Sequence, residues 1–260
     1  MAQGGNGQVR VWEDFTSGLA QTLSDATEYQ FNQIRLAAIS GNVAMDIDVT
    51  APNGIATFSG AAGATDGVSI YAMPFQVSTQ GTITMECRWK TSAITSYGFF
   101  IGWQSTVAVA EPVNPFTLSG TTLTANNGGS VFGIYFDTAA TTDAVRVMAS
   151  TGGVALTTAL GLDGVALGSL GKAVNHTFTA AKWNYTRIEL DPDGEGRVFY
   201  GDISNDPGNT GPVLVGGIRA GVMSTTALYH PIATLVDPST NDPLHSVDFF
   251  GAYAGRNWAY

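Results

Sequence analysis

The sequence predicts an all-β fold built as an antiparallel β-sandwich, and two observations support this prediction. The 260 residues include 32 Gly and only 12% charged residues, and the 44% that are hydrophobic lie in short runs. Such a composition favours strands and turns over helices. Segments that alternate polar and apolar residues recur between Gly, Pro and Asn turns, and roughly twelve to fifteen such strands would pack as two sheets.

The chain length suits one large domain with a short extension. We expect an N-terminal arm or connector over residues 1–42 and the β-sandwich over residues 43–260. Residues 8–15 have the pattern of a strand added to a sheet, whereas residues 17–40 fit no single period, and Ser24 with the acidic residues after it resembles a helix start. The arm residues expected to contact a neighbouring protein are Val9, Val11, Trp12 and Phe15.

Several strands are predicted in the first half of the sandwich. Residues 43–49 alternate cleanly, and residues 55–58 and 68–71 form shorter strands between Gly and Ala loops. Residues 82–90 give the clearest pattern, because polar and apolar side chains alternate along the whole segment. The apolar face of that strand carries Ile83, Met85, Cys87 and Trp89, and the polar face carries Thr84, Glu86, Arg88 and Lys90.

Residues 98–103 are apolar on both faces, which is typical of a central or interfacial strand. Residues 104–130 form a long insertion rich in Pro, Thr, Asn and Gly, and loops of this length commonly carry function. Residues 131–137 and 144–150 predict a hairpin, and residues 151–171 a covering loop. The candidate glycan-contact or interface residues of the insertion are Glu111, Asn114, Phe116, Asn126 and Asn127.

A second hairpin is predicted around residues 183–200. Strand residues up to Asp191 alternate in polarity, and the Pro-Asp-Gly-Glu-Gly segment that follows is a turn signal, because Gly tolerates positive φ. Further strands are expected at residues 211–216, 231–235 and 246–254.

These segments together resemble a known family. Gly98-Phe-Phe-Ile-Gly102, Gly133-Ile-Tyr-Phe-Asp137, the Trp183 hairpin and the closing Val247–Arg256 segment are similar to the concanavalin-A-like (LamG-like) jelly roll. The closing segment, with a Pro-led strand such as His230-Pro-Ile-Ala-Thr234 before it, resembles the ending of such domains in tailed-bacteriophage virion structural proteins. The resemblance covers residues 43–256 and is a pattern of strands, not of catalytic groups.

The resemblance implies a jelly roll and a virion structural protein assembled in the host cytoplasm. We expect a capsid decoration or cement protein that binds the major capsid protein or other virion proteins and forms homo-oligomers. The alternative is a carbohydrate-binding module of a tail or head fibre that contacts host glycans. Trp258 and Tyr260, at the end of the chain, are further interface candidates, and exposed aromatic residues elsewhere would serve either role.

Charge and cysteine content exclude other classes. The net charge of −10 repels phosphate backbones and anionic lipids, so we expect no nucleic-acid or membrane partner. Nothing approaches a run of about 18 apolar residues. Cys87 is the single cysteine, so no intrachain disulfide can form.

Glu189 and Asp191 are candidate catalytic carboxylates, because glucanases of the same fold carry a Glu-x-Asp-x-x-Glu strand. Retaining hydrolysis needs two carboxyl groups about 5 Å apart that face one cleft. Here Pro192 and Gly194 interrupt the strand, and Glu195 lies out of register. A solvated strand face is therefore the favoured interpretation, and we expect no enzyme.

Metal and cofactor motifs are also weak. Residues 191–195 resemble part of a calcium-binding loop but lack its full ligand spacing. A hairpin turn explains the same residues without a metal. Calcium binding by other loops of the chain is left open. His176, His230 and His245 are scattered without metal-ligand spacing. We expect no cofactor.

Overall fold

The computed structural model describes most of the chain. The described residues are 8–16, 20–24, 27–39, 41–51, 54–60, 66–95, 97–105, 116–119, 122–125, 129–138, 140, 143–174, 178–202, 212–237 and 244–255. They form two antiparallel sheets packed against each other, with one short helix, α1 (Val77–Gln80). The prediction of an all-β antiparallel sandwich is confirmed.

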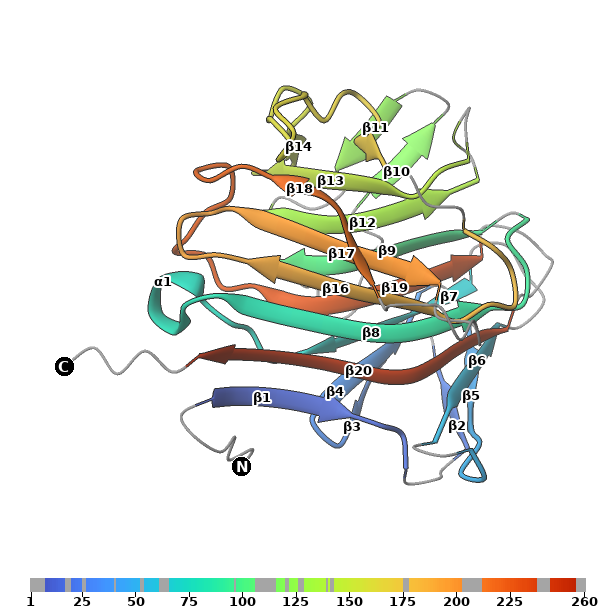
Figure 1. Ribbon diagram of the computed structural model, residues 1–260. Helices are drawn as coiled ribbons and strands as arrows, with labels where there is room; N and C mark the ends of the chain where they lie inside the picture. Colours follow the sequence, from blue (N-terminus) through green and yellow to red (C-terminus); the bar gives the residue numbers. More distant parts are fainter. Residues whose placement is uncertain are drawn as a thin grey trace.

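The first sheet, called sheet 1, contains both the first and the last described strand (Figure 1). Its order is β18 (Val213–Ile218), β17 (Gly196–Asp202), β16 (Asn184–Leu190), β8 (Ile83–Thr91), β20 (His245–Gly255), β6 (Ala56–Gly60), β5 (Val43–Ile47) and β2 (Gln21–Leu23). Strand β1 (Gln8–Glu13) pairs with the C-terminal half of β20. The two termini of the described chain therefore lie side by side in one sheet.

The second sheet, called sheet 2, carries the other half of the core. Its order is β14 (Val154–Ala155), β13 (Arg146–Thr151), β12 (Val131–Asp137), β9 (Gly98–Gln104), β19 (His230–Asp237), β7 (Asp66–Ala72), β4 (Ile34–Ala38) and β3 (Glu28–Phe31), with β15 (Lys172–Ala173) beside β13. A separate hairpin of β10 (Phe116–Ser119) and β11 (Thr122–Ala125) completes the described strands.

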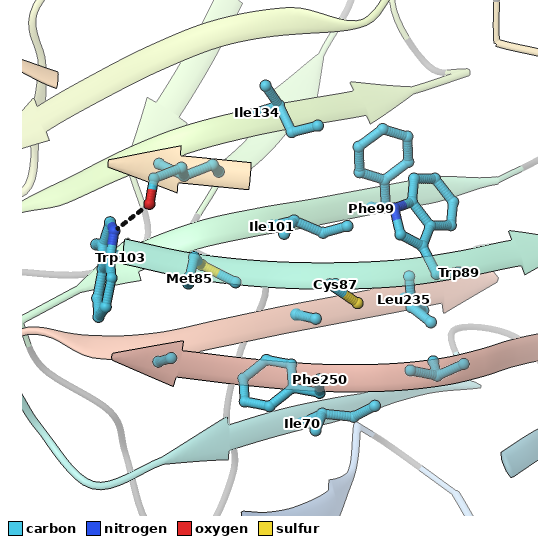
Figure 2. Close-up of a cluster of buried hydrophobic side chains, with 14 of the residues drawn as sticks. Ile70, Met85, Cys87, Trp89, Phe99, Ile101, Trp103, Ile134, Leu235 and Phe250 are labelled. Carbon is cyan, nitrogen blue, oxygen red and sulfur yellow. Dashed lines mark hydrogen bonds between the residues drawn. The ribbon is translucent and has the colours of Figure 1, made fainter. Parts of the chain in front are cut away.

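The core lies between the two sheets, and Figure 2 shows its centre. The inward side chains of β8 predicted from the sequence, Met85, Cys87 and Trp89 among them, are 0% exposed. Trp103 of β9 donates its indole N–H to the Ile188 carbonyl of the opposite sheet at 3.2 Å (Figure 2). A buried N–H without an acceptor would cost about 1–3 kcal/mol, so this bond lets a tryptophan fill the core.

Strand β9 is buried on both faces, as its apolar sequence predicted. Phe99 and Ile101 point into the core, whereas Phe100 points outward and is covered by Phe116 of the β10–β11 hairpin, at 5.7 Å between ring centroids. Phe116 is only 2% exposed. Phe116, predicted as a candidate glycan-contact or interface residue, thus packs inside this chain, where the hairpin uses it to cover the outer face of sheet 2.

Residues 21–38 differ in secondary structure from what the sequence suggested. Residues 21–38 form strands β2, β3 and β4 and contain no helix in the part described, although Ser24 resembles a helix start. The strand period was obscured because Ala37 and Ala38 at the end of β4 are both buried. In place of a helix, a tight hairpin with Asn32 at φ 51° joins β3 to β4.

Glu13 fastens β1 to that hairpin. Its carboxylate accepts hydrogen bonds from the Phe15 backbone N–H and the Asn32 side-chain amide, both at 2.9 Å. Burial raises the pKa of Glu13, against the effect of these two bonds. The segment expected to form an arm thus contributes, over its described residues, strands to both sheets of the sandwich.

Candidate binding surface

The outward side of sheet 1 collects aromatic and charged side chains from strands that are distant in sequence. Because successive strand residues point to opposite faces, Glu86 and Arg88 point outward on either side of the buried Cys87. Pairing aligns Glu86 with Arg187 of β16 and with Gly251 of β20. We call the following set the outer face: Arg10, Trp12, Glu86, Arg88, Lys90, Trp183, Tyr185, Arg187, Glu189, Arg197, Phe199, Phe249 and Tyr253.

Three rings form a continuous aromatic group on the outer face. Trp12 stacks on Phe249 at 4.8 Å between centroids and 16° between planes, and Phe249 meets the edge of Tyr185 at 5.7 Å. The guanidinium carbon of Arg10 lies 4.4 Å from the Trp12 ring centroid. All three rings are half-buried, so they present apolar surface while staying fixed by one another.

A fourth ring, Trp183, lies at the end of the outer face where β8 finishes. The Arg88 guanidinium carbon is 4.7 Å and the Lys90 ammonium nitrogen 4.6 Å from its ring centroid. Arg88 also donates to the Asp248 carboxylate at 2.6 Å. Cation–π attraction of this kind holds both cations near the indole.

An ion-pair network occupies the opposite end of the face. Arg197 contacts the carboxylates of Glu189 at 2.9 Å, Asp191 at 2.6 Å and Glu195 at 3.1 Å. Burial acts against the charge of Arg197, but these carboxylates outweigh it and raise the pKa of the guanidinium. Arg187 also pairs with Glu189. Glu189 and Asp191 therefore share one arginine, which suits fixed hydrogen-bond acceptors better than a nucleophile and an acid.

The structure places the N-terminal candidate residues in different environments. Val11 and Phe15 are 1% and 0% exposed and lie in the core of this chain, so their side chains do not reach the surface. Val9 is half-buried and packs against the same core. Only Trp12 points to the outer face.

The remaining candidates, Glu111, Asn114, Asn126, Asn127, Trp258 and Tyr260, lie outside the described residues.

Sequence reasoning did not single out Trp183, Tyr185 and Phe249 as a site. The polar face of β8 was visible as alternation, but the alignment of β8 with β16 and β20 brings together residues far apart in the sequence. Arg88 and Asp248, for example, are 160 positions apart. A period-2 pattern shows which side chains share a strand face and does not show which strands are neighbours.

Of the described histidines, His230 is half-buried and His245 is buried, and the single cysteine is buried as well. His230 Nδ1 lies 2.9 Å from the Ala72 carbonyl oxygen, and burial lowers its pKa. His245 is 3% exposed beside the Tyr97 ring, and His176 lies outside the described residues. Burial raises the pKa of the Cys87 thiol. Among the described residues, no three His, Cys, Asp or Glu side chains gather as a metal site would require.

Helices give no sign of a membrane segment either: in the described part of the chain, none has the length and apolar character to cross a bilayer.

No protein-family model and no curated protein matches the sequence. Solved structures do resemble the fold. The carbohydrate recognition domain of Emp47p aligns with a TM-score of 0.53 at 11% identity, over 98% of this chain and 100% of that one. Peanut lectin aligns with a TM-score of 0.51 at 9% identity, over 92% and 97% of the two chains. The VIP36 exoplasmic/lumenal domain in its Ca2+/Man2-bound form gives 0.51 at 12%, over 92% and 88%.

These likenesses define the class of fold: the chain is a concanavalin-A-like, lectin-type jelly-roll sandwich. The resemblance inferred from Gly98–Gly102 and the Val247–Arg256 segment is confirmed at the level of the fold. At 9–12% identity, these alignments establish architecture and assign no binding residue.

Proposed function

We propose that this protein is a non-enzymatic carbohydrate-binding domain and that the outer face of sheet 1 contacts the sugar. The observation that carries the proposal is the juxtaposition of half-buried aromatic rings with charged groups held in place by ion pairs. Aromatic faces pack on the apolar C–H side of a sugar ring, while carboxylates and guanidinium groups bond its hydroxyls. Sites of this kind combine apolar area with a few oriented polar groups.

The fold supports this role without assigning it. Emp47p is described as having a carbohydrate recognition domain, peanut lectin is a lectin, and the VIP36 domain is described in a Ca2+/Man2-bound form. The same architecture serves many functions, so the proposal depends on the chemistry of the outer face.

The ion pairs that Glu189 and Asp191 form with Arg197 favour a binding role over hydrolysis. A retaining glycosidase needs one carboxylate as nucleophile and a second carboxyl group that donates a proton. Here Arg197 bonds both Glu189 and Asp191, and the Thr82 hydroxyl donates to Asp191 at 2.5 Å. In these contacts both carboxylates act as hydrogen-bond acceptors, and both are bound to the same guanidinium group.

A glycan array followed by calorimetry on the best ligand tests the proposal. Trp183→Ala and Trp12→Ala remove single rings from the outer face, and each is expected to weaken binding about tenfold or more. Tyr29→Ala is the matched control, because Tyr29 is a half-buried aromatic residue of sheet 2. Unchanged affinity in both tryptophan variants, or equal loss in the control, would contradict the proposal.

A second candidate is the virion role implied by the resemblance of the closing strand. In this proposal the protein decorates a phage head assembled in the host cytoplasm, binds capsid or other virion proteins, and forms homo-oligomers. The observation that favours it is the composition of the outer face, since Trp, Tyr, Phe and Arg are enriched in protein interfaces. Phe249 and Tyr253 of this face belong to the closing strand itself.

Occupancy on purified heads separates the two roles. Deletion of residues 1–16 would also remove the core residues Val11 and Phe15, so the point variant Arg10→Glu is the cleaner probe of the same edge. The virion role predicts reduced head occupancy for Arg10→Glu and no competition by glycans. Full occupancy of the variant would argue against attachment through this edge.

A further inference from the structure

We infer that the sugar recognised by the outer face is acidic, with its carboxylate or sulfate bound at the corner formed by Arg88, Lys90 and Trp183. This inference rests on the proposed carbohydrate-binding function and adds the chemical class of the ligand. It follows from the uneven distribution of charge over the face.

The corner is built by the strand geometry of β8. Arg88 and Lys90 are two residues apart, so both side chains point to the same outward side. Asn184 of β16 pairs with Trp89, which brings the preceding residue, Trp183, next to Lys90. The indole thus has two cations within 5 Å of its centroid, at 4.7 and 4.6 Å.

Positive charge is in excess at this corner. Two cations, Arg88 and Lys90, face one carboxylate, Asp248, which leaves a charge of +1 in a chain whose net charge is −10. Asp248 accepts from Arg88 Nη1, and the buried Nε of Arg88 has no hydrogen-bond partner. Among the described residues, no carboxylate lies within 4.0 Å of the Lys90 ammonium.

The opposite end of the same face has the reverse balance. Arg197 contacts the carboxylates of Glu189, Asp191 and Glu195, and Arg187 pairs with Glu189 and Glu86. Two cations therefore meet four carboxylates, and the local charge is −2. An anionic group would be repelled there and attracted at Lys90. A sugar with one acidic substituent is therefore oriented, with its acid at Trp183 and its neutral rings toward Tyr185 and Trp12.

The contact has predictable strength. A hydrogen bond to a charged group contributes about 1.5–3 kcal/mol, which corresponds to roughly tenfold or more in affinity. Because Lys90 is partly exposed to solvent, added salt screens the attraction. Affinity for the acidic sugar should therefore fall as ionic strength rises, whereas affinity for a neutral sugar should not.

The experiment uses the full chain and matched polysaccharides. Calorimetry compares polygalacturonate with its carboxyl-reduced neutral form, and dextran sulfate with dextran. The wild-type protein is expected to bind at least one acidic polymer about tenfold more tightly than its neutral partner. Preference for the carboxylated or for the sulfated polymer supports the inference and identifies the acid.

Two variants locate the contact. Lys90→Gln is expected to abolish the preference for the acidic polymer over its neutral partner. Lys172→Gln is the control, because Lys172 pairs with Asp163 beside sheet 2, away from the outer face. Circular dichroism spectra that match the wild type confirm that each variant is folded.

The outcomes separate this inference from the proposed function. Equal binding of acidic and neutral polymers, or a preference that survives Lys90→Gln, overturns the acidic-sugar assignment and leaves carbohydrate binding intact. Failure of the wild-type protein to bind any glycan, in these titrations and on the array, overturns the proposed function itself.

Discussion

Trp12 and Gly251 face each other across the β1–β20 pair, and the indole ring of Trp12 fills the space that a side chain at position 251 would take. A Cβ atom built on Gly251 would lie 2.3 Å from Trp12 Cε3. The glycine therefore allows the indole to lie flat across β20 and stack on Phe249.

Gly251→Ala should displace Trp12 and weaken glycan binding about as much as Trp12→Ala does. The reason is steric, because a Cβ contact below 3 Å forces the ring to move. Calorimetry on the best array ligand measures the effect. Gly98→Ala is the control, since its added Cβ would meet its nearest atom, the Phe136 carbonyl oxygen, at an ordinary 3.5 Å. Wild-type affinity in Gly251→Ala would show that the stacked position of Trp12 is not needed.

Gly102→Ala should destabilise the fold without acting on the outer face. Gly102 pairs with Gly133 between β9 and β12, and an added Cβ would lie 2.2 Å from the Phe132 carbonyl oxygen. Overpacking of a core typically costs about 1–3 kcal/mol, and backbone atoms cannot move aside as side chains do. Urea unfolding should show a lower midpoint than for Gly98→Ala, and an equal midpoint for the two variants would be inconsistent with this packing.

Acid should destabilise the protein through His245. Burial lowers the pKa of His245 from 6.5 to about 4, so the unfolded chain takes up a proton below pH 6.5 while the folded chain stays neutral until about pH 4. The free energy of unfolding should therefore fall as pH drops from about 6.5 to 4, by on the order of 3 kcal/mol.

Urea titrations at several pH values test this window. Burial also lowers the pKa of His230, so both histidines act in the same direction. The useful quantity is the difference between the wild type and His245→Asn, which lacks the titrating ring. The variant should lose less stability between pH 6.5 and 4 than the wild type does. Parallel pH profiles for the two proteins would contradict this prediction, because they would mean that His245 has the same pKa in the folded and the unfolded chain.

Arg197→Gln should disturb the ion-pair network and create no hydrolase. The substitution leaves Glu189, Asp191 and Glu195 without their shared cation, so the three carboxylates repel one another. Because Arg197 is 31% exposed, solvent screens this repulsion, and we expect a loss of about 1 kcal/mol in stability. A reducing-sugar assay should show no turnover in the wild type or the variant. Turnover abolished by Glu189→Gln would contradict a binding role.

The sequence predicted most of the sandwich because its strands carry local signals. The alternation of Ile83, Met85, Cys87 and Trp89 is complete within one strand, and the turn of the β16–β17 hairpin is marked by Asp193-Gly194. Such features need no information about neighbours. Strands β2 to β4 were missed, because Ala37 and Ala38 are buried in succession and break the period.

The binding surface was less predictable, for a different physical reason. Trp12 was singled out for its position in an apparent arm, whereas Trp183 and Phe249 entered only as parts of the fold resemblance and not as binding residues. They meet only because β16, β8, β20 and β1 lie next to one another in sheet 1. Long-range strand order follows from the packing of the whole sandwich and not from the pattern of any one strand.

The most direct test of the account is a solution NMR titration of the protein with the preferred glycan, following the side-chain N–H signals of the tryptophans. We predict that the Trp183 and Trp12 signals shift with ligand concentration. The signals of Trp89 and Trp103, whose indoles donate to Thr186 and Ile188 inside the core, should stay in place. Binding that leaves the Trp12 and Trp183 signals unmoved would contradict the assignment of the sugar to the outer face of sheet 1.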